Sequence, residues 1–206
     1  MSGLDWRVIE SAQRKTIPFA HIAVPQVLEP ACAAAIAGSY PAIESPGSFA
    51  LRDAPPGSAL LALIADLTSP RFTAAMEKAF DLDLRGRPSV VTLRGQSSPR
   101  DGRIHTDSKS KILSLLLYLN ANWTSPEGQL RLLPAANDLD AHAVEIPATM
   151  GSLVAFPRSD GSWHGHTPFV GQRRVLQLNY LRSSEASWIG DWRHRLSALG
   201  KPRVAA

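Results

Sequence analysis

The second half of the chain constrains the fold most, because it divides into short apolar segments that suit strands. From Ser89 onward these segments are rich in Leu, Val and Ile and are bounded by Gly, Pro, Asn or Asp, as strands and turns are. No helical pattern separates them, which argues against alternating strand–helix units. Their spacing predicts a double-sheet jelly roll, with candidate strands at residues 89–94, 103–107, 111–119, 128–133, 143–147, 151–157, 161–167 and 173–181.

The first half of the chain predicts helices that support this β core. Residues 28–40 begin with a Pro in the first turn, continue Ala-rich and end at a Gly. A second helical region over 59–82 is interrupted where Ser69 can cap the helix that follows. The Pro-rich stretch 41–58 predicts a loop, and the weak alternation over 19–24 predicts a first strand.

The chain shows no repeat, no low-complexity segment and no clear domain boundary, so we expect a single domain over residues 1–206. Within it, 1–88 is a helical lead-in and support, 89–181 is the jelly-roll core, and 182–206 is a C-terminal helix and tail. The closing helix is predicted over 185–199. The fold class is therefore mainly β with flanking helices (α+β), a cupin-like double-stranded β-helix.

Composition excludes several classes of protein. The net charge of +4 and the pI near 9.6 are mildly basic, but Lys and Arg are scattered and form no run of the nucleic-acid type. The single cysteine, Cys32, excludes an internal disulfide and hence a disulfide-stapled scaffold. No signal peptide is evident, and no window reaches the ~18 apolar residues of a membrane span. We expect a soluble cytoplasmic protein that binds neither nucleic acid nor membrane.

A His and an Asp two residues apart, His105 and Asp107, precede the most apolar run of the chain. In an extended segment residues i and i+2 face the same side, so this imidazole and carboxylate can reach one point. Far downstream, His164 and His166 compete for a third place beside them, because they too are two residues apart. Two His and one carboxylate on one face of Fe(II) form the facial triad of non-haem iron oxygenases. The order of these residues predicts such a site.

Two arginines open the last candidate strand, and either could serve an α-keto acid cosubstrate. The keto and carboxylate oxygens of such an acid chelate iron, and its distal carboxylate then needs a cation. A guanidinium matches a carboxylate through two parallel hydrogen bonds. Neighbouring strand residues face opposite sides, so one of Arg173 and Arg174 points inward. Tyr118, at the end of an apolar run, can donate its phenol to the same carboxylate.

These motifs resemble the prolyl-4-hydroxylase-like branch of the 2-oxoglutarate- and Fe(II)-dependent dioxygenases. The resemblance covers roughly residues 89–181, and the order, spacing and strand context of its segments agree. The matching segments are IHTD at 104–107, LLLYLNANW at 115–123, EGQLRLL at 127–133, GSLVAF at 151–156 and WHGHTPFVGQR at 163–173.

The resemblance implies a role for particular residues. It implies that His105, Asp107 and His164 are the iron ligands and the catalytic residues. Pro168 stands four residues after His164, as a Pro does after the distal ligand in the family, and His166 then faces the substrate or supports the ligands.

For the cosubstrate, the family's Gly-x-Lys/Arg pair is matched by Gly171-Gln172-Arg173, which implies Arg173 as the 2-oxoglutarate contact. Tyr118 is similar to the family's second cosubstrate contact, and Arg174 is the alternative to its neighbour. The sequence departs from the family at Gln129, since the family commonly has Gly-Gly before the following Leu.

The function implied is a hydroxylase that uses Fe(II), 2-oxoglutarate and O2, with ascorbate as a further reductant. Its substrate would be a small molecule or the amino-acid side chain of a peptide, and its other products succinate and CO2. Two alternatives come from other classes. A cupin-like metal- or sugar-binding module without redox turnover would keep the histidines without needing an Arg on the next strand. A protein–protein scaffold on the same fold would bind neither metal nor cosubstrate.

Overall fold

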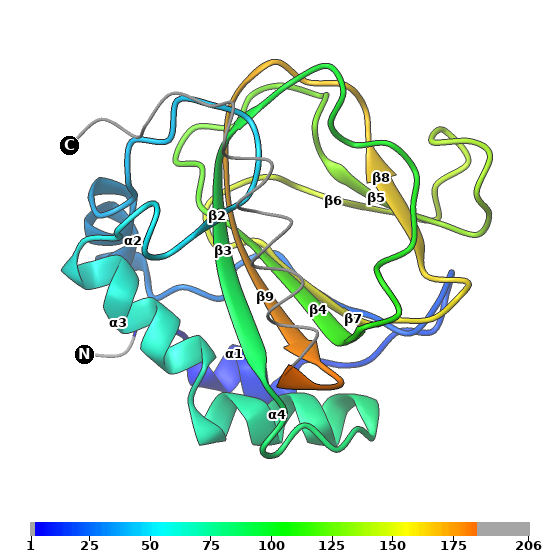
Figure 1. The fold of residues 1–206 in the computed structure, drawn as a ribbon, viewed down its shortest axis with the longest axis horizontal. Helices are drawn as coiled ribbons and strands as arrows, with labels where there is room; N and C mark the ends of the chain where they lie inside the picture. Colours follow the sequence, from blue (N-terminus) through cyan, green and yellow to red (C-terminus); the bar gives the residue numbers. More distant parts are fainter. Residues whose placement is uncertain (1–2, 185–206) are drawn as a thin grey trace.

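The computed structural model describes residues 3–184. The helix predicted over 185–199 lies outside these residues. Two antiparallel sheets form the β core (Figure 1), and the strands pair in the order β1-β7-β4-β9-β3-β2 in the larger sheet and β6-β5-β8 in the smaller one. The larger sheet consists of β1 (Ile22–Val24), β2 (Phe49–Ala50), β3 (Ser89–Ser97), β4 (Lys111–Tyr118), β7 (Leu153–Pro157) and β9 (Gly171–Leu181). The smaller sheet consists of β5 (Leu130–Leu133), β6 (Val144–Ile146) and β8 (Trp163–His166).

Four helices precede β3 among the described residues: α1 (Trp6–Ser11), α2 (Pro30–Gly38), α3 (Ser58–Leu67) and α4 (Pro70–Phe80). Their ends follow local capping chemistry. The Asp5 carboxylate accepts from the first backbone N–H groups of α1, and the Ser69 hydroxyl accepts from the Phe72 N–H at the start of α4. Asp81, with φ 55°, ends α4 in the left-handed conformation.

The two faces of the larger sheet bury different kinds of side chain. One face carries alternate leucines of β4 and β9, such as Leu115 and Leu178, and packs them against α3 and α4 in the main apolar cluster. The opposite face looks towards the smaller sheet and carries Ser114, Arg173 and Asn179, all of them buried. Figure 1 shows the helices on one side of the larger sheet and the smaller sheet on the other. The space between the sheets is therefore where polar chemistry can be placed.

Most of the expected elements are confirmed, and the differences have physical reasons. The jelly-roll core is confirmed, with seven of the eight candidate strands present at shifted bounds. The expected strand over 103–107 is wrong, because only His105 forms a β-bridge there, with His164. The short helix α1 was not predicted, and the short strand β2 lies within the expected loop 41–58.

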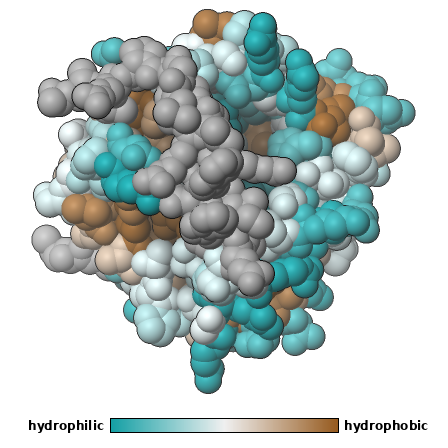
Figure 2. All heavy atoms as spheres, viewed as in Figure 1, coloured by the Kyte–Doolittle hydropathy of each residue, from teal (hydrophilic) through white to brown (hydrophobic). Residues whose placement is uncertain are grey.

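No single helix among the described residues is long and apolar enough to cross a membrane. The pair α3–α4, bent by 45°, reaches the required length and composition only when the two helices are taken together. In the main apolar cluster α3 buries leucines and α4 buries phenylalanines. On the face drawn in Figure 2 hydrophobic residues gather on the side where α3 lies. There Leu61 is 48% exposed.

Candidate active site

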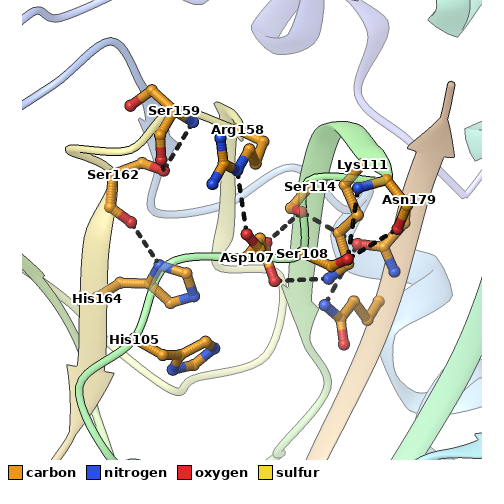
Figure 3. Close-up of polar contacts among 12 residues, drawn as sticks. His105, Asp107, Ser108, Lys111, Ser114, Arg158, Ser159, Ser162, His164 and Asn179 are labelled. Atoms are coloured by element: carbon orange, nitrogen blue, oxygen red, sulfur yellow. Dashed lines mark hydrogen bonds and ion pairs between the residues drawn. The ribbon is translucent and has the colours of Figure 1, made fainter. Parts of the chain in front are cut away.

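His105 and Asp107, two residues apart, meet the distant His164 in space. His105, Asp107 and His164 each offer one ligand atom, and these atoms lie within 4.8 Å of one another. The backbones of His105 and His164 exchange both N–H···O bonds at 3.0 Å, and the centroids of their imidazole rings are 4.3 Å apart. Figure 3 shows the two rings side by side, with Asp107 between them and β4. The predicted triad is thus assembled with His164 as its late member.

Glycines allow the segment before His105 to approach β8. Gly102 has φ +86°, and a Cβ there would stand 2.3 Å from the carbonyl oxygen of His166. A Cβ at Gly165 would stand 2.7 Å from the carbonyl oxygen of Gly102. The His166 N–H donates to that same Gly102 oxygen at 2.9 Å. The segment is therefore aligned with β8 at two points, although it is too irregular to be a strand.

Backbone carbonyls fix the tautomer of both triad histidines. The Nδ1 atom of His105 lies 2.8 Å from the carbonyl oxygen of Arg103, and that of His164 lies 3.0 Å from the carbonyl oxygen of Ser162. A carbonyl can only accept, so in each ring Nδ1 carries the hydrogen and Nε2 keeps its lone pair. This is the arrangement by which proteins orient histidine ligands of metals.

Asp107 is the most heavily contacted member of the triad. Its Oδ1 accepts from the Lys111 ammonium at 2.6 Å, and its Oδ2 accepts from the Ser114 hydroxyl. Its backbone oxygen accepts from Arg158 Nε at 3.1 Å (Figure 3). Burial alone would raise the pKa of Asp107, but the charges of Lys111 and His164 and the two side-chain hydrogen bonds lower it below the ordinary value. The carboxylate is therefore ionised and ready to bind a cation.

Burial keeps the late histidine neutral. The His164 side chain is 5% exposed, and its ring packs against that of Phe156 with centroids 4.8 Å apart. Desolvation lowers the pKa of His164 to about 4, although the Asp107 charge opposes this. A neutral imidazole at neutral pH has the free lone pair that a metal ligand needs.

The triad fits a first-row divalent metal ion. Bonds of about 2.1 Å to a common ion place ligand atoms roughly 3 to 4 Å apart, which agrees with the mutual separations within 4.8 Å. Two imidazoles and one carboxylate suit iron in the facial-triad arrangement. In addition, both histidine tautomers present Nε2, and the carboxylate is ionised. The residues present therefore fit an Fe(II) ion.

The face of the larger sheet that looks towards the smaller sheet also carries a buried guanidinium. Arg173 on β9 is 5% exposed; its Nε donates to the Gly128 carbonyl at 2.8 Å and its Nη2 to the Tyr118 hydroxyl at 3.2 Å. Burial lowers the pKa of the Arg173 guanidinium, because it disfavours the charged form. Burial raises the pKa of the Tyr118 phenol for the same reason, although the Arg173 charge opposes this. Among the described residues Arg173 has no carboxylate within ion-pair distance. The predicted cosubstrate residues Arg173 and Tyr118 thus form one cationic pocket.

The structure separates the doubled residues that the sequence left open. Arg174 faces the opposite side of the sheet, where its Nη1 donates to the Ala37 carbonyl at 3.1 Å and its guanidinium lies over the Tyr40 ring. It is therefore no part of the cationic pocket. His166 points to the same side as His164 but is not one of the three clustered ligands. Burial, and next the Arg173 charge, lower its pKa to about 4.

Sequence reasoning missed the side chains that hold Asp107. The predicted site includes none of the three: Lys111, Ser114 and Arg158. A signal for Ser114 was present, because it is the only hydroxyl in the otherwise apolar run from Ile112 to Leu117. A buried polar residue in such a run needs a hydrogen-bond partner.

Comparison with known proteins gives a family match over the segment that carries this site. Residues 96–182 match the sequence model of the family described as the 2OG-Fe(II) oxygenase superfamily. The matched segment contains all three triad residues together with Tyr118 and Arg173. No curated protein sequence matches the chain.

Solved structures of prolyl hydroxylases share the fold. A prolyl-4-hydroxylase from Pseudomonas putida is similar over 85% of this chain and 96% of its own, with 17% identity and a TM-score of 0.55. A prolyl 4-hydroxylase from Phytophthora capsici is similar over 85% of this chain and 68% of its own, with 18% identity and a TM-score of 0.56. A Trichoplax adhaerens prolyl hydroxylase in complex with a peptide fragment of hypoxia inducible factor is similar over 82% of this chain and 86% of its own, with 16% identity and a TM-score of 0.52.

The family match, the fold and the site support the same class of protein. Residues 96–182 match the model of the 2OG-Fe(II) oxygenase superfamily, and the predicted resemblance to the prolyl-4-hydroxylase-like branch is confirmed. The prediction of an oxidoreductase of this class is likewise confirmed. The family implies Fe(II) and 2-oxoglutarate, and the His-Asp-His group provides a matching set of ligands.

Proposed function

We propose that the protein is a dioxygenase that hydroxylates a small molecule or an amino-acid side chain and converts 2-oxoglutarate and O2 into succinate and CO2. One oxygen atom of O2 enters the substrate as its hydroxyl group, and the other enters the new carboxylate of succinate. His105, Asp107 and His164 would hold Fe(II), which supplies the redox chemistry when bound. The protein would contribute the metal ligands, orient the reactants and exclude water from the site.

The observation that carries this proposal is the buried guanidinium of Arg173. An ionised group that is 5% exposed and has no acidic partner among residues 3–184 is costly to bury unless an anion completes its surroundings. Its remaining neighbours, the Tyr118 hydroxyl and the Gly128 carbonyl, leave donors for a carboxylate. The distal carboxylate of 2-oxoglutarate would complete this pocket.

Exposure of the triad indicates where a substrate would approach. His105 is exposed, whereas Asp107 and His164 are buried, 8% and 5% exposed. A substrate would therefore reach the metal from the His105 side, while the cosubstrate lies on the Arg173 side. The peptide bound by the Trichoplax adhaerens prolyl hydroxylase supports a peptide as one class of substrate.

A metal- or sugar-binding module without redox turnover is the alternative function. Such a module explains the histidine–carboxylate triad as well as an oxygenase does. It gives no reason for the buried guanidinium and phenol at Arg173 and Tyr118. The oxygenase explains both groups, so we favour it.

Anaerobic titration with 2-oxoglutarate separates the two functions. Protein loaded with Mn(II) is titrated, with Arg173→Met and Asp107→Ala as variants. We expect binding by the wild type that is lost in Arg173→Met, and succinate release in air with Fe(II) that is lost in Asp107→Ala. Mass spectrometry of candidate peptides and small molecules then looks for one added oxygen atom. Metal binding without 2-oxoglutarate binding would establish the alternative module.

A further inference from the structure

Asp107 is approached by a cation of the protein itself. The Lys111 ammonium lies 2.6 Å from Oδ1 of the carboxylate that would bind the metal. The lysine side chain is 18% exposed and the aspartate side chain 8%, so water and salt screen this pair poorly. Among the described residues Lys111 has no other acidic partner. The ammonium and a metal ion therefore both need the same carboxylate.

The other oxygen of Asp107 is held by a neutral donor. The Ser114 hydroxyl donates to Oδ2 and also lies 3.1 Å from Oδ1 of Asn179. Both Ser114 and Asn179 are buried, and they project from adjacent strands, since Ser114 on β4 pairs with Asn179 on β9. Figure 3 shows the Ser114 hydroxyl and the Lys111 ammonium both reaching the Asp107 carboxylate. Unlike Lys111, Ser114 orients the carboxylate without bringing a charge.

We propose that Lys111 competes with the metal for Asp107 and weakens its binding, whereas Ser114 is a positioning residue that strengthens it. This inference rests on the proposed metal site of the oxygenase. A divalent ion beside Asp107 is repelled by an ammonium a few ångströms away, and the ammonium also neutralises the charge that attracts the ion. A hydroxyl that fixes the ligand oxygen has the opposite effect, because it removes the entropic cost of orienting the carboxylate.

The other charged groups around Asp107 do not share this role. Arg158 donates to the backbone oxygen of Asp107 rather than to its carboxylate, and its own guanidinium pairs with Asp160 at 2.6 Å. His164 faces the carboxylate but is neutral and serves as a ligand. Lys111 is thus the one cation in residues 3–184 that pairs with the metal-binding carboxylate. Half-occupancy of the metal site then requires a higher concentration of free Fe(II) than the triad alone would.

Metal affinity measures this competition directly and needs no substrate. Mn(II) binding to the full chain is followed by electron paramagnetic resonance of the free ion, without 2-oxoglutarate. We expect Lys111→Met to bind Mn(II) at least about tenfold more tightly than the wild type. We expect Ser114→Ala to bind it about 10- to 100-fold more weakly, with affinity restored by Ser114→Thr, which keeps the hydroxyl.

Two matched controls separate these effects from general changes in charge or packing. Lys109→Met removes an exposed lysine from the same loop, and Ser152→Ala removes a buried hydroxyl without a hydrogen-bond partner in the described part of the chain. Both should bind Mn(II) as the wild type does. Circular dichroism of each variant confirms that it is folded before titration.

The proposal requires that Lys111→Met and Ser114→Ala change the Mn(II) affinity in opposite directions. Weaker or unchanged Mn(II) binding in folded Lys111→Met overturns the competition, and wild-type affinity in Ser114→Ala overturns the positioning role. These outcomes are independent of turnover. If the wild type binds Mn(II) but releases no succinate, the proposed oxygenase activity fails while the competition stands.

Discussion

Adjacent arginines on one strand show how differently the two faces of the larger sheet are used. Arg173 is buried between the sheets and contacts the Tyr118 hydroxyl, whereas Arg174 contacts the Ala37 carbonyl and the Tyr40 ring on the helix-covered side. The same alternation places Ser114 beside Asp107 and its neighbour Leu115 in the main apolar cluster. One face carries the chemistry, and the other supplies the burial that keeps the sheet folded.

This comparison predicts that substitutions on one face of the larger sheet impair ligand binding, whereas substitutions on the other face reduce stability. The inner face of the larger sheet looks towards the smaller sheet, and a polar group there is retained at some cost to stability, because desolvated charges are expensive. The outer face is covered by helices, and an apolar group there contributes stability and touches no ligand. The variants below test this division, in order of the size of the effect.

The largest effect is expected from Arg173→Met. Removing the guanidinium takes away the charge-assisted hydrogen bonds to the distal carboxylate of 2-oxoglutarate, which should weaken binding by about 10²- to 10³-fold. The thermal unfolding temperature should stay the same or rise, because a buried charge without an acidic partner is removed. Calorimetric titration of 2-oxoglutarate into Mn(II)-loaded protein and a melting curve measure the two quantities.

Arg174→Met is the matched control on the outer face. It should bind 2-oxoglutarate as the wild type does and should melt at a slightly lower temperature, since contacts with Ala37 and Tyr40 are lost. If Arg174→Met and not Arg173→Met abolishes 2-oxoglutarate binding, the assignment of the faces is wrong.

On the outer face, Leu178→Ala should mainly reduce stability. Leu178 is fully buried in the main apolar cluster, so truncation leaves a cavity and should lower the free energy of unfolding by about 2 to 5 kcal/mol. Urea denaturation measures this loss, and 2-oxoglutarate titration of the folded variant should give the wild-type affinity. A folded Leu178→Ala protein with lost cosubstrate binding would contradict the separation of the faces.

Much of the fold was predictable because its signals are local. The turn residues after Ser89 mark the strands, and the cap at Ser69 marks α4. The strand predicted over residues 103–107 is absent, although their mixture of apolar and polar residues suits one. The path of this segment instead follows β8 through contacts at Gly102 and His105, and such contacts between distant segments are not written in the local sequence.

The site was predictable in kind but not in every residue. The i, i+2 spacing brought His105 and Asp107 to one face, and the same rule left His164 and His166 equivalent until their partner strand was known. Which of Arg173 and Arg174 points between the sheets depends on the register of β9, and this register is set by pairing with β3 and β4. Likewise Lys111 is four residues from Asp107, but only the turn between them brings the ammonium back to the carboxylate.

Buried histidines on the inner face should make stability depend on pH. Burial lowers the pKa of His166 to about 4 from an ordinary 6.5, so between these values the unfolded chain binds a proton that the folded chain does not. Stability is therefore complete above about pH 6.5 and falls as the pH decreases towards 4, by roughly 3 kcal/mol for this group. Urea denaturation of metal-free protein at several pH values measures the slope.

His166→Gln is the variant that tests this source of pH dependence. Its loss of stability between pH 6.5 and 4 should be smaller than that of the wild type, because one of the groups that titrates differently in the two states is absent. His142→Gln would be a poor control, because the half-buried His142 ring lies near Glu145. His105 and His164 are also unsuitable, as both are proposed ligands. An unchanged slope in His166→Gln would show that His166 is not buried in its neutral form.

The smallest effect is expected from Tyr118→Phe, which removes one hydroxyl from the cationic pocket. The ring is fully buried and packs in the apolar cluster between the sheets, so the variant keeps its shape and loses only the contact with Arg173. If the phenol donates to the distal carboxylate of 2-oxoglutarate, affinity should fall about tenfold, the value of one hydrogen bond to a charged group. Calorimetric titration measures this fall. Because the guanidinium remains, a loss as large as that of Arg173→Met would mean that Tyr118 orients the arginine rather than binding the cosubstrate itself.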